Sequence, residues 1–106
     1  MFRFLLVSLL TLLLTSCIGA DTVITGKVSE SIDFNQVEVF YNTNPDCQYN
    51  VIAQIKIPGE YFSQRQIIDG FRQQAAEIGA PAVQVTYLQR TGTGEYYGSA
   101  RAIRCG

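Results

Sequence analysis

The chain has 106 residues and a formal net charge of −1, so its length allows one globular domain and its charge gives no basic surface for nucleic acid. It contains no histidine, the side chain used most often as a general base, a metal ligand and a pH switch. We therefore expect no nucleic-acid partner, no metal, no cofactor and no enzymatic activity.

Residues 1–16 are typical of a bacterial secretory signal peptide. A short start with one basic residue, Arg3, precedes a leucine-rich apolar run over residues 5–14. A membrane-spanning helix needs about 20 apolar residues, and this run ends at Thr15 and Ser16. We expect the segment to be cleaved rather than kept as an anchor.

The next residues predict the type of signal. Leu14, Thr15, Ser16 and Cys17 match the lipobox of bacterial lipoproteins, an apolar residue and two small residues followed by cysteine. The Cys17 thiol would take the diacylglycerol, and each buried methylene of the acyl chains contributes about 0.8 kcal/mol to anchorage. An ordinary signal peptide with a chance cysteine is the alternative, but the cysteine lies where the cut would fall.

Residues 17–22 form a short lipidated tether, and residues 23–106 form the single domain, which should sit close to the bilayer. Ile18 follows the lipidated cysteine, at the position where aspartate is the usual inner-membrane retention signal in enteric bacteria. We therefore expect an outer-membrane lipoprotein that faces the periplasm, if the host is Gram-negative.

Five segments have the composition or alternation of β-strands. In the third, a regular alternation from Tyr49 to Ile57 is followed by Pro58 and Gly59, which should end the strand. In the fourth, Val83, Val85 and Tyr87 should share one face. The predicted strands are residues 22–28, 36–41, 49–57, 82–88 and 96–105.

One amphipathic helix lies between the third and fourth strands. Ser63 and Gln66 fit a capping box, and Phe62 and Ile67 fit a hydrophobic staple. Gly79 stands at the position where helices end in a left-handed residue. The order β-β-β-α-β-β predicts an α+β fold, a mostly antiparallel sheet with the helix on one face.

Cys47 and Cys105 remain once Cys17 is lipidated. In an oxidising envelope an even pair of cysteines predicts a disulfide, and two buried free thiols are the alternative. If both strands run regularly, each cysteine falls at the edge of an apolar face, where the bond would be shielded.

The last predicted strand carries the one candidate binding surface. Tyr96, Tyr97, Arg101 and Arg104 would give an aromatic and cationic surface for a glycan or a peptide. Tyrosines in strands are also common packing residues, so the alternative that these tyrosines are half-buried stays open.

Three segments resemble a known group of small bacterial envelope proteins. Residues 47–55, 75–83 and 99–105 are similar to its central strand, helix exit and last strand. The group includes RcsF-like stress-sensor lipoproteins, YbjQ-type domains and uncharacterised lipoproteins. The resemblance spans about residues 36–105 and implies a small α/β domain with a disulfide near the sheet end. RcsF-like sensors carry two disulfides and a long arm, so the nearest resemblance is to the uncharacterised lipoproteins with two domain cysteines.

The sequence therefore predicts a non-enzymatic, lipid-anchored periplasmic domain. It would bind another envelope component, a protein of stress surveillance or envelope assembly. The alternative is a small-molecule or metal-binding domain of the YbjQ-like type.

Overall fold

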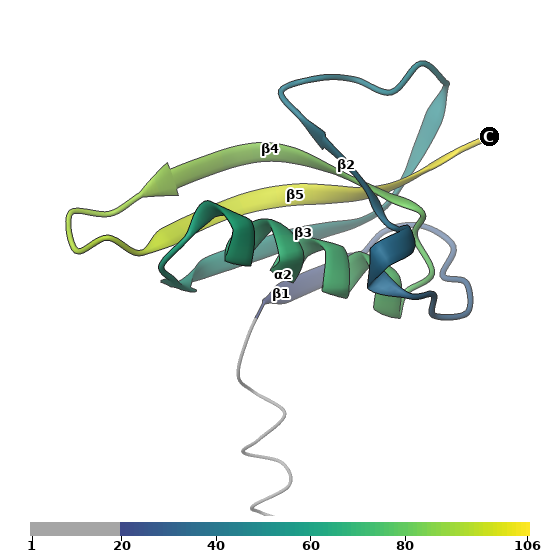
Figure 1. Cartoon of the computed structure of the whole chain (residues 1–106). Coiled ribbons are helices and arrows are strands. Elements are labelled where there is room, and N and C mark those ends of the chain that lie inside the picture. The colour runs from purple at the N-terminus through teal and green to yellow at the C-terminus, as the bar shows by residue number, and fades with distance from the viewer. Residues whose placement is uncertain (1–19) are drawn as a thin grey trace, which may run out of the picture.

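One five-stranded sheet and one α-helix make up the fold in the computed structural model, which describes residues 20–106 (Figure 1). The predicted signal peptide, Cys17 and Ile18 lie outside the described residues. The predicted α+β class and the β-β-β-α-β-β order are confirmed. The elements are β1 (Asp21–Ile24), the 3-10 turn η1 (Phe34–Gln36), β2 (Glu38–Tyr41), β3 (Tyr49–Tyr61), α2 (Gln64–Glu77), β4 (Ala82–Arg90) and β5 (Tyr96–Cys105).

The strand order in the sheet is β1-β3-β5-β4-β2, and only the β2–β4 pair is parallel. Strands β3 and β4 run in the same direction with β5 between them, so α2 crosses one face of the sheet to connect them. Strand β2 lies at the edge of the sheet beside β4 and runs in the same direction as β3. The segment of residues 42–48, which connects β2 to β3, must therefore also cross the sheet. It crosses the face opposite to the one that α2 covers (Figure 1).

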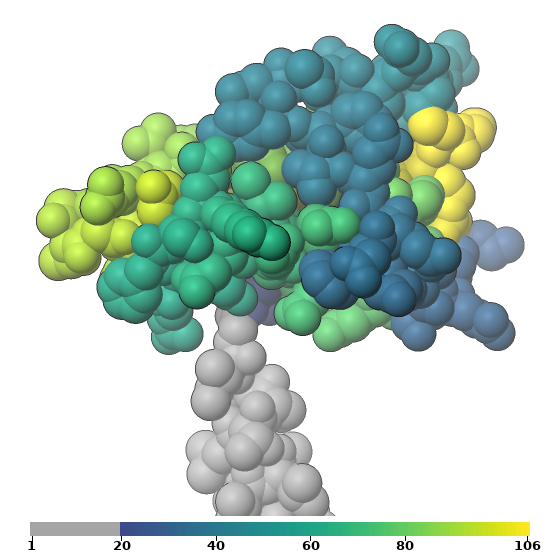
Figure 2. Space-filling model, viewed as in Figure 1, coloured from purple at the N-terminus to yellow at the C-terminus, as the bar shows by residue number. Residues whose placement is uncertain are grey.

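The core lies between α2 and the sheet. Phe71 and Ile67 of the helix are fully buried against Ile55, Ile57 and Val83 of the strands. The fully buried residues that strand β5 supplies to this core are Ala100 and Ala102, and these small side chains allow the helix to pack closely over the centre of the sheet. In the space-filling view α2 and the segment around η1 lie in front of the strands (Figure 2).

Both predicted ends of the helix are confirmed. Ser63 is the N-cap, and its hydroxyl accepts a hydrogen bond from the Gln66 N–H at 3.2 Å. The Gln66 side chain accepts from the Phe62 N–H rather than from Ser63, so the capping box is shifted by one residue. Phe62 stays 66% exposed, so the predicted staple with Ile67 buries little of it.

Gly79 ends the helix with a φ of 73°. Its N–H donates to the Ala76 carbonyl, and the N–H of Ala80 donates to the Ala75 carbonyl, the bond pattern of a Schellman motif. A side chain on Gly79 would also strike the Glu30 carbonyl oxygen. The position therefore requires glycine for its conformation and for the close approach of the neighbouring chain.

Gly70 faces two side chains of β3, Tyr61 and Ile57. A Cβ there would lie 3.0 Å from the Tyr61 hydroxyl and 3.1 Å from Cδ1 of Ile57. Glycine lowers helix propensity by up to about 1 kcal/mol relative to alanine, but it lets Tyr61 and Ile57 fill this space.

A β-bulge at Thr86 corrects the predicted pattern of β4. Val85 pairs with Ala100, and Tyr87 pairs with the next residue of β5, Ser99. The extra residue reverses the alternation, so Val83 and Val85 face the helix whereas Tyr87 points to the opposite face and is 46% exposed. The prediction that Tyr87 shares a face with the valines is wrong.

Strand β3 also departs from regular alternation. A bulge at Ile52 separates Val51, which pairs with Ile103, from Ala53, which pairs with Ala102. The carbonyl of Ile52 accepts from the N–H groups of both Thr25 and Gly26, and this irregularity ends β1 at Ile24 instead of residue 28. Pro58 and Gly59 do not end β3, which continues through an irregular stretch to Tyr61.

Candidate functional site

The four predicted surface residues of β5 divide between the two faces of the sheet. Tyr96 packs against the helix-side core, and Nη2 of Arg104 donates to the Gly79 carbonyl at 2.8 Å. Tyr97 and Arg101 lie on the opposite face, beside Tyr87 and Gln84 respectively. Of the four predicted residues, Tyr97 and Arg101 therefore share one face of the sheet. Tyr96 packs against the core on the other face, and Arg104 bonds to the carbonyl at the end of the helix.

We call the side of the sheet opposite α2 the helix-free face. It carries an aromatic pair, Tyr87 and Tyr97, whose ring centroids are 5.8 Å apart and whose hydroxyls are 3.4 Å apart. Donation of this hydrogen bond to Tyr97 raises the pKa of Tyr87 above its ordinary value of 10.0, with smaller effects of burial and of the Tyr97 charge. Sequence alternation missed Tyr87 because the Thr86 bulge has no signature in the sequence.

A pocket of about 270 Å³ opens on the helix-free face under the segment of residues 42–48. We call it the amide pocket, because three side-chain amides contribute to its lining. It lies where the 42–48 segment passes over β4 and β5. Its lining residues are Asn42, Thr43, Asn44, Tyr49, Gln84, Val85, Thr86 and Arg101.

Gln84 of β4 connects the sheet, which forms the floor of the amide pocket, to the 42–48 segment, which forms its wall. It is 8% exposed although it faces away from the helix. Its Oε1 accepts from the Tyr49 hydroxyl at 3.4 Å, and its Nε2 donates to Oδ1 of Asn44 at 2.6 Å and to the Thr43 carbonyl at 3.4 Å. Every polar atom of this buried amide therefore has a partner, as buried polar groups require.

Among the residues that the structure describes, Arg101 is the only charged one that lines the amide pocket. Within residues 20–106 its guanidinium makes no hydrogen bond and no ion pair, whereas Arg72 pairs with Asp69 at 3.4 Å. In the sheet Arg101 stands between Gln84 of β4 and Gln54 of β3. A half-buried cation among neutral amides leaves a local positive charge that a bound anion would neutralise.

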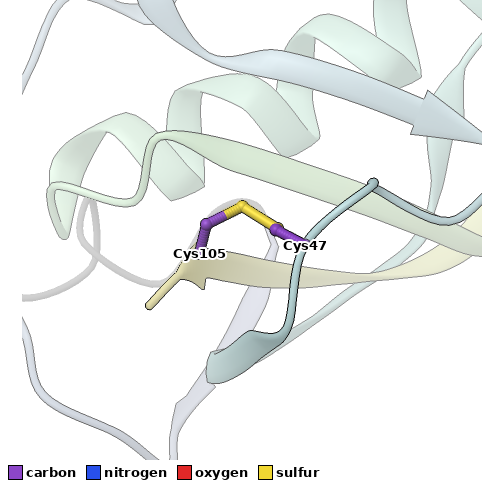
Figure 3. Close-up of a disulfide and its surroundings, with 2 residues drawn as sticks. All are labelled: Cys47 and Cys105. Atoms are coloured by element: carbon purple, nitrogen blue, oxygen red, sulfur yellow. A yellow bond between two sulfur atoms is a disulfide. The ribbon is translucent and has the colours of Figure 1, made fainter.

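The predicted disulfide is present between Cys47 and Cys105 (Figure 3). It connects the end of the 42–48 segment to the last residue of β5, and the two residues' Cα atoms are 5.7 Å apart. Cys105 is exposed and Cys47 half-buried. The expectation of a bond shielded at an apolar edge is therefore wrong: Cys105 is exposed at the end of β5 although it shares parity with the buried Ile103. The assumed regular run of β3 also fails, because the Ile52 bulge puts Val51 and Ile55 on opposite faces.

Two further observations concern a possible metal site and a possible membrane-spanning helix. Within residues 20–106 no three His, Cys, Asp or Glu side chains cluster in a way that could hold a metal ion. In the same part of the chain no helix is long and apolar enough to cross a membrane.

Comparison with known proteins gives no match: no protein-family model fits the chain, and no curated protein or solved structure is significantly similar to it. The resemblance to RcsF-like lipoproteins therefore remains a prediction from short motifs.

Proposed function

We propose that this protein is a non-enzymatic lipoprotein domain that binds another component of the bacterial envelope through the helix-free face of its sheet. The observation that carries the proposal is the composition of that face. It presents the Tyr87–Tyr97 pair, in which Tyr87 is exposed and Tyr97 half-buried, and Arg101, whose guanidinium has no hydrogen-bond or ion-pair partner within residues 20–106. Tyrosine and arginine are enriched at binding hot spots, because both offer large contact area with a polar group at the end.

The other face of the sheet is committed to the fold. Helix α2 covers it, and the side chains there form the core. Even Tyr96 and Arg104, the two predicted surface residues on that side, pack against the core or bond to the helix end. The part of the helix-free face that the 42–48 segment leaves open is thus the surface of the sheet that remains for a partner.

Anchorage is supported by the lipobox and by the position of β1. Strand β1 begins at Asp21, four residues after Cys17. A lipid on Cys17 would hold the domain within a few residues of the bilayer and restrict its partners to components at the same membrane surface. Outer-membrane placement facing the periplasm rests on Ile18 and belongs to the same proposal.

The proposed surface can be tested with a photo-reactive benzoylphenylalanine placed at position 87 in the full chain in its native host. A matched control replaces Phe62, another aromatic residue, which is 66% exposed and lies in the link between β3 and α2, outside the strands of the sheet. We expect a discrete crosslinked species from position 87 that is absent from position 62. Equal crosslinking at both positions, or none at position 87, would contradict the proposal.

A further inference from the structure

We propose that the amide pocket binds the carboxylate of a small polar ligand, or the terminal carboxylate of a longer one, through Arg101 and Asn44. This inference deepens the proposed function and rests on it for the physiological source of the ligand.

The hydrogen bonds around Gln84 fix the orientation of Asn44. The Thr43 carbonyl can only accept, so the Gln84 atom 3.4 Å from it is Nε2, and the same Nε2 faces Asn44. Oε1 of Gln84 then accepts from the Tyr49 hydroxyl. An N–H group donates only to an acceptor, and the Asn44 atom 2.6 Å away is accordingly Oδ1. This leaves Nδ2 of Asn44 as a donor with no partner within residues 20–106.

Two unused donor groups therefore line one pocket, the Asn44 amide and the Arg101 guanidinium. Among the described residues 20–106, no carboxylate side chain lines it. A pocket with free donors and a single positive charge favours an anion over a cation or a neutral ligand.

The charge and size of the pocket favour a carboxylate. One guanidinium balances one negative charge, whereas a dianionic phosphate would keep a second charge without a partner. The volume of about 270 Å³ lies just below the range of roughly 300–1,000 Å³ usual for small-molecule sites. An amino-acid derivative or the end of a peptide fits this size. Tyr49 and Thr86 also line the pocket, and their hydroxyls could accept from an amide N–H of such a ligand.

The test uses saturation-transfer difference NMR on the full lipidated chain in detergent micelles, with N-acetylglycine as the probe. N-acetylglycinamide, which has the same amide but no charge, is the matched control ligand. We expect saturable transfer to N-acetylglycine and none to the neutral amide. Inorganic phosphate, added as a competitor, should displace the probe weakly. Displacement by phosphate at concentrations below those of N-acetylglycine would overturn the assignment to a carboxylate.

Two variants test the residues. Arg101→Gln removes the charge, and Asn44→Asp keeps the oxygen that bonds to Gln84 while replacing the free donor by a negative charge. Each should weaken the binding of N-acetylglycine about tenfold or more, the usual effect of losing a charge-assisted hydrogen bond. Lys56→Gln removes the same charge from an exposed residue on the same face outside the pocket, and it should leave the affinity unchanged.

The outcomes separate this inference from the proposed function. Absence of transfer to N-acetylglycine, or equal affinity in Arg101→Gln and the unaltered protein, would refute the carboxylate site. Crosslinking from position 87 would then still stand on its own. Binding of N-acetylglycine without crosslinking would instead support the pocket and refute the proposed partner surface. Circular dichroism and retention of the disulfide would show that each variant is folded.

Discussion

Tyr49 and Cys105 lie directly opposite each other in the β3–β5 pairing. Cys105 is bonded to Cys47, so the disulfide stands immediately beside the residue whose hydroxyl holds Gln84. The N–H of Gly106 adds a hydrogen bond to the Gln48 carbonyl at 3.0 Å. The covalent bond thus fixes both the end of β5 and the chain that forms the wall of the amide pocket.

Replacing both cysteines by serine should lower the free energy of unfolding by about 2–4 kcal/mol, because the bridge closes a long loop and restricts the unfolded chain. The sequence separation of 58 residues places the expected effect toward the upper end of that range. Urea unfolding of the double variant and of the oxidised protein measures the difference. Easy reduction of the native protein without loss of stability would support a redox switch instead.

The hydrogen bond between Tyr87 and Tyr97 predicts an alkaline titration. The hydrogen bond, with smaller effects of burial and of the Tyr97 charge, raises the pKa of Tyr87 above 10.0 in the folded protein. Any stability from it is therefore complete below that value and lost as the pH rises through the raised pKa. In ¹³C-tyrosine NMR titrations, Tyr97→Phe should return the pKa of Tyr87 toward 10.0. Tyr41→Phe, a change at another exposed tyrosine, should leave it unchanged.

The helix could be predicted from the sequence because its signals are local. Ser63 and Gly79 act through bonds to residues no more than four positions away, so the chain itself records where α2 begins and ends. The disulfide was predictable for a similar reason, since only two cysteines follow Cys17.

The candidate site could not be predicted in the same way, because it depends on two bulges and a crossing segment. Thr86 and Ile52 are ordinary strand residues, and only the pairing with β5 shows that each is an extra residue. Those bulges decide which face receives Tyr87 and Tyr49. The burial of Gln84 follows from the passage of residues 42–48 over β4, which the order of elements does not specify.

Gly70→Ala should destabilise the domain in spite of the better helix propensity of alanine. The added methyl would crowd the Tyr61 hydroxyl and Ile57, and overpacking costs about 1–3 kcal/mol against a propensity gain of up to about 1 kcal/mol. We expect a net loss of about 1 kcal/mol in urea unfolding. The loss should shrink when Ile57→Val, which removes the contacting methyl, is the background. An unchanged or increased loss there would show that crowding is not the cause.

Cys17→Ala should abolish acylation and leave the protein unprocessed or soluble. Metabolic labelling with a fatty-acid analogue, followed by fractionation, measures both effects. A variant that is still processed and partitions with membranes would contradict the lipobox interpretation. If the host is Gram-negative, the unaltered protein should band with outer-membrane markers in a sucrose gradient because Ile18 is not aspartate. Recovery with inner-membrane markers would contradict the predicted placement.

The last prediction concerns the amide that holds the 42–48 segment in place. Gln84→Met has a similar size but cannot bond, so it would leave the Tyr49 hydroxyl and Oδ1 of Asn44 without the partners they have now. Loss of partners at a buried polar group costs about 1–3 kcal/mol, and we expect a decrease of that size in the free energy of unfolding.

The matched control is Gln54→Met. Gln54 stands on the other side of Arg101 in the same row of the sheet, is exposed and makes no side-chain hydrogen bond within residues 20–106. Its replacement should change stability by no more than about 0.5 kcal/mol. Amide hydrogen exchange over residues 42–48 gives the second measurement, because the segment should exchange faster in Gln84→Met and at the native rate in Gln54→Met. Equal effects of the two variants would show that the Gln84 hydrogen bonds do not hold the segment, and that the disulfide alone fixes the wall of the pocket.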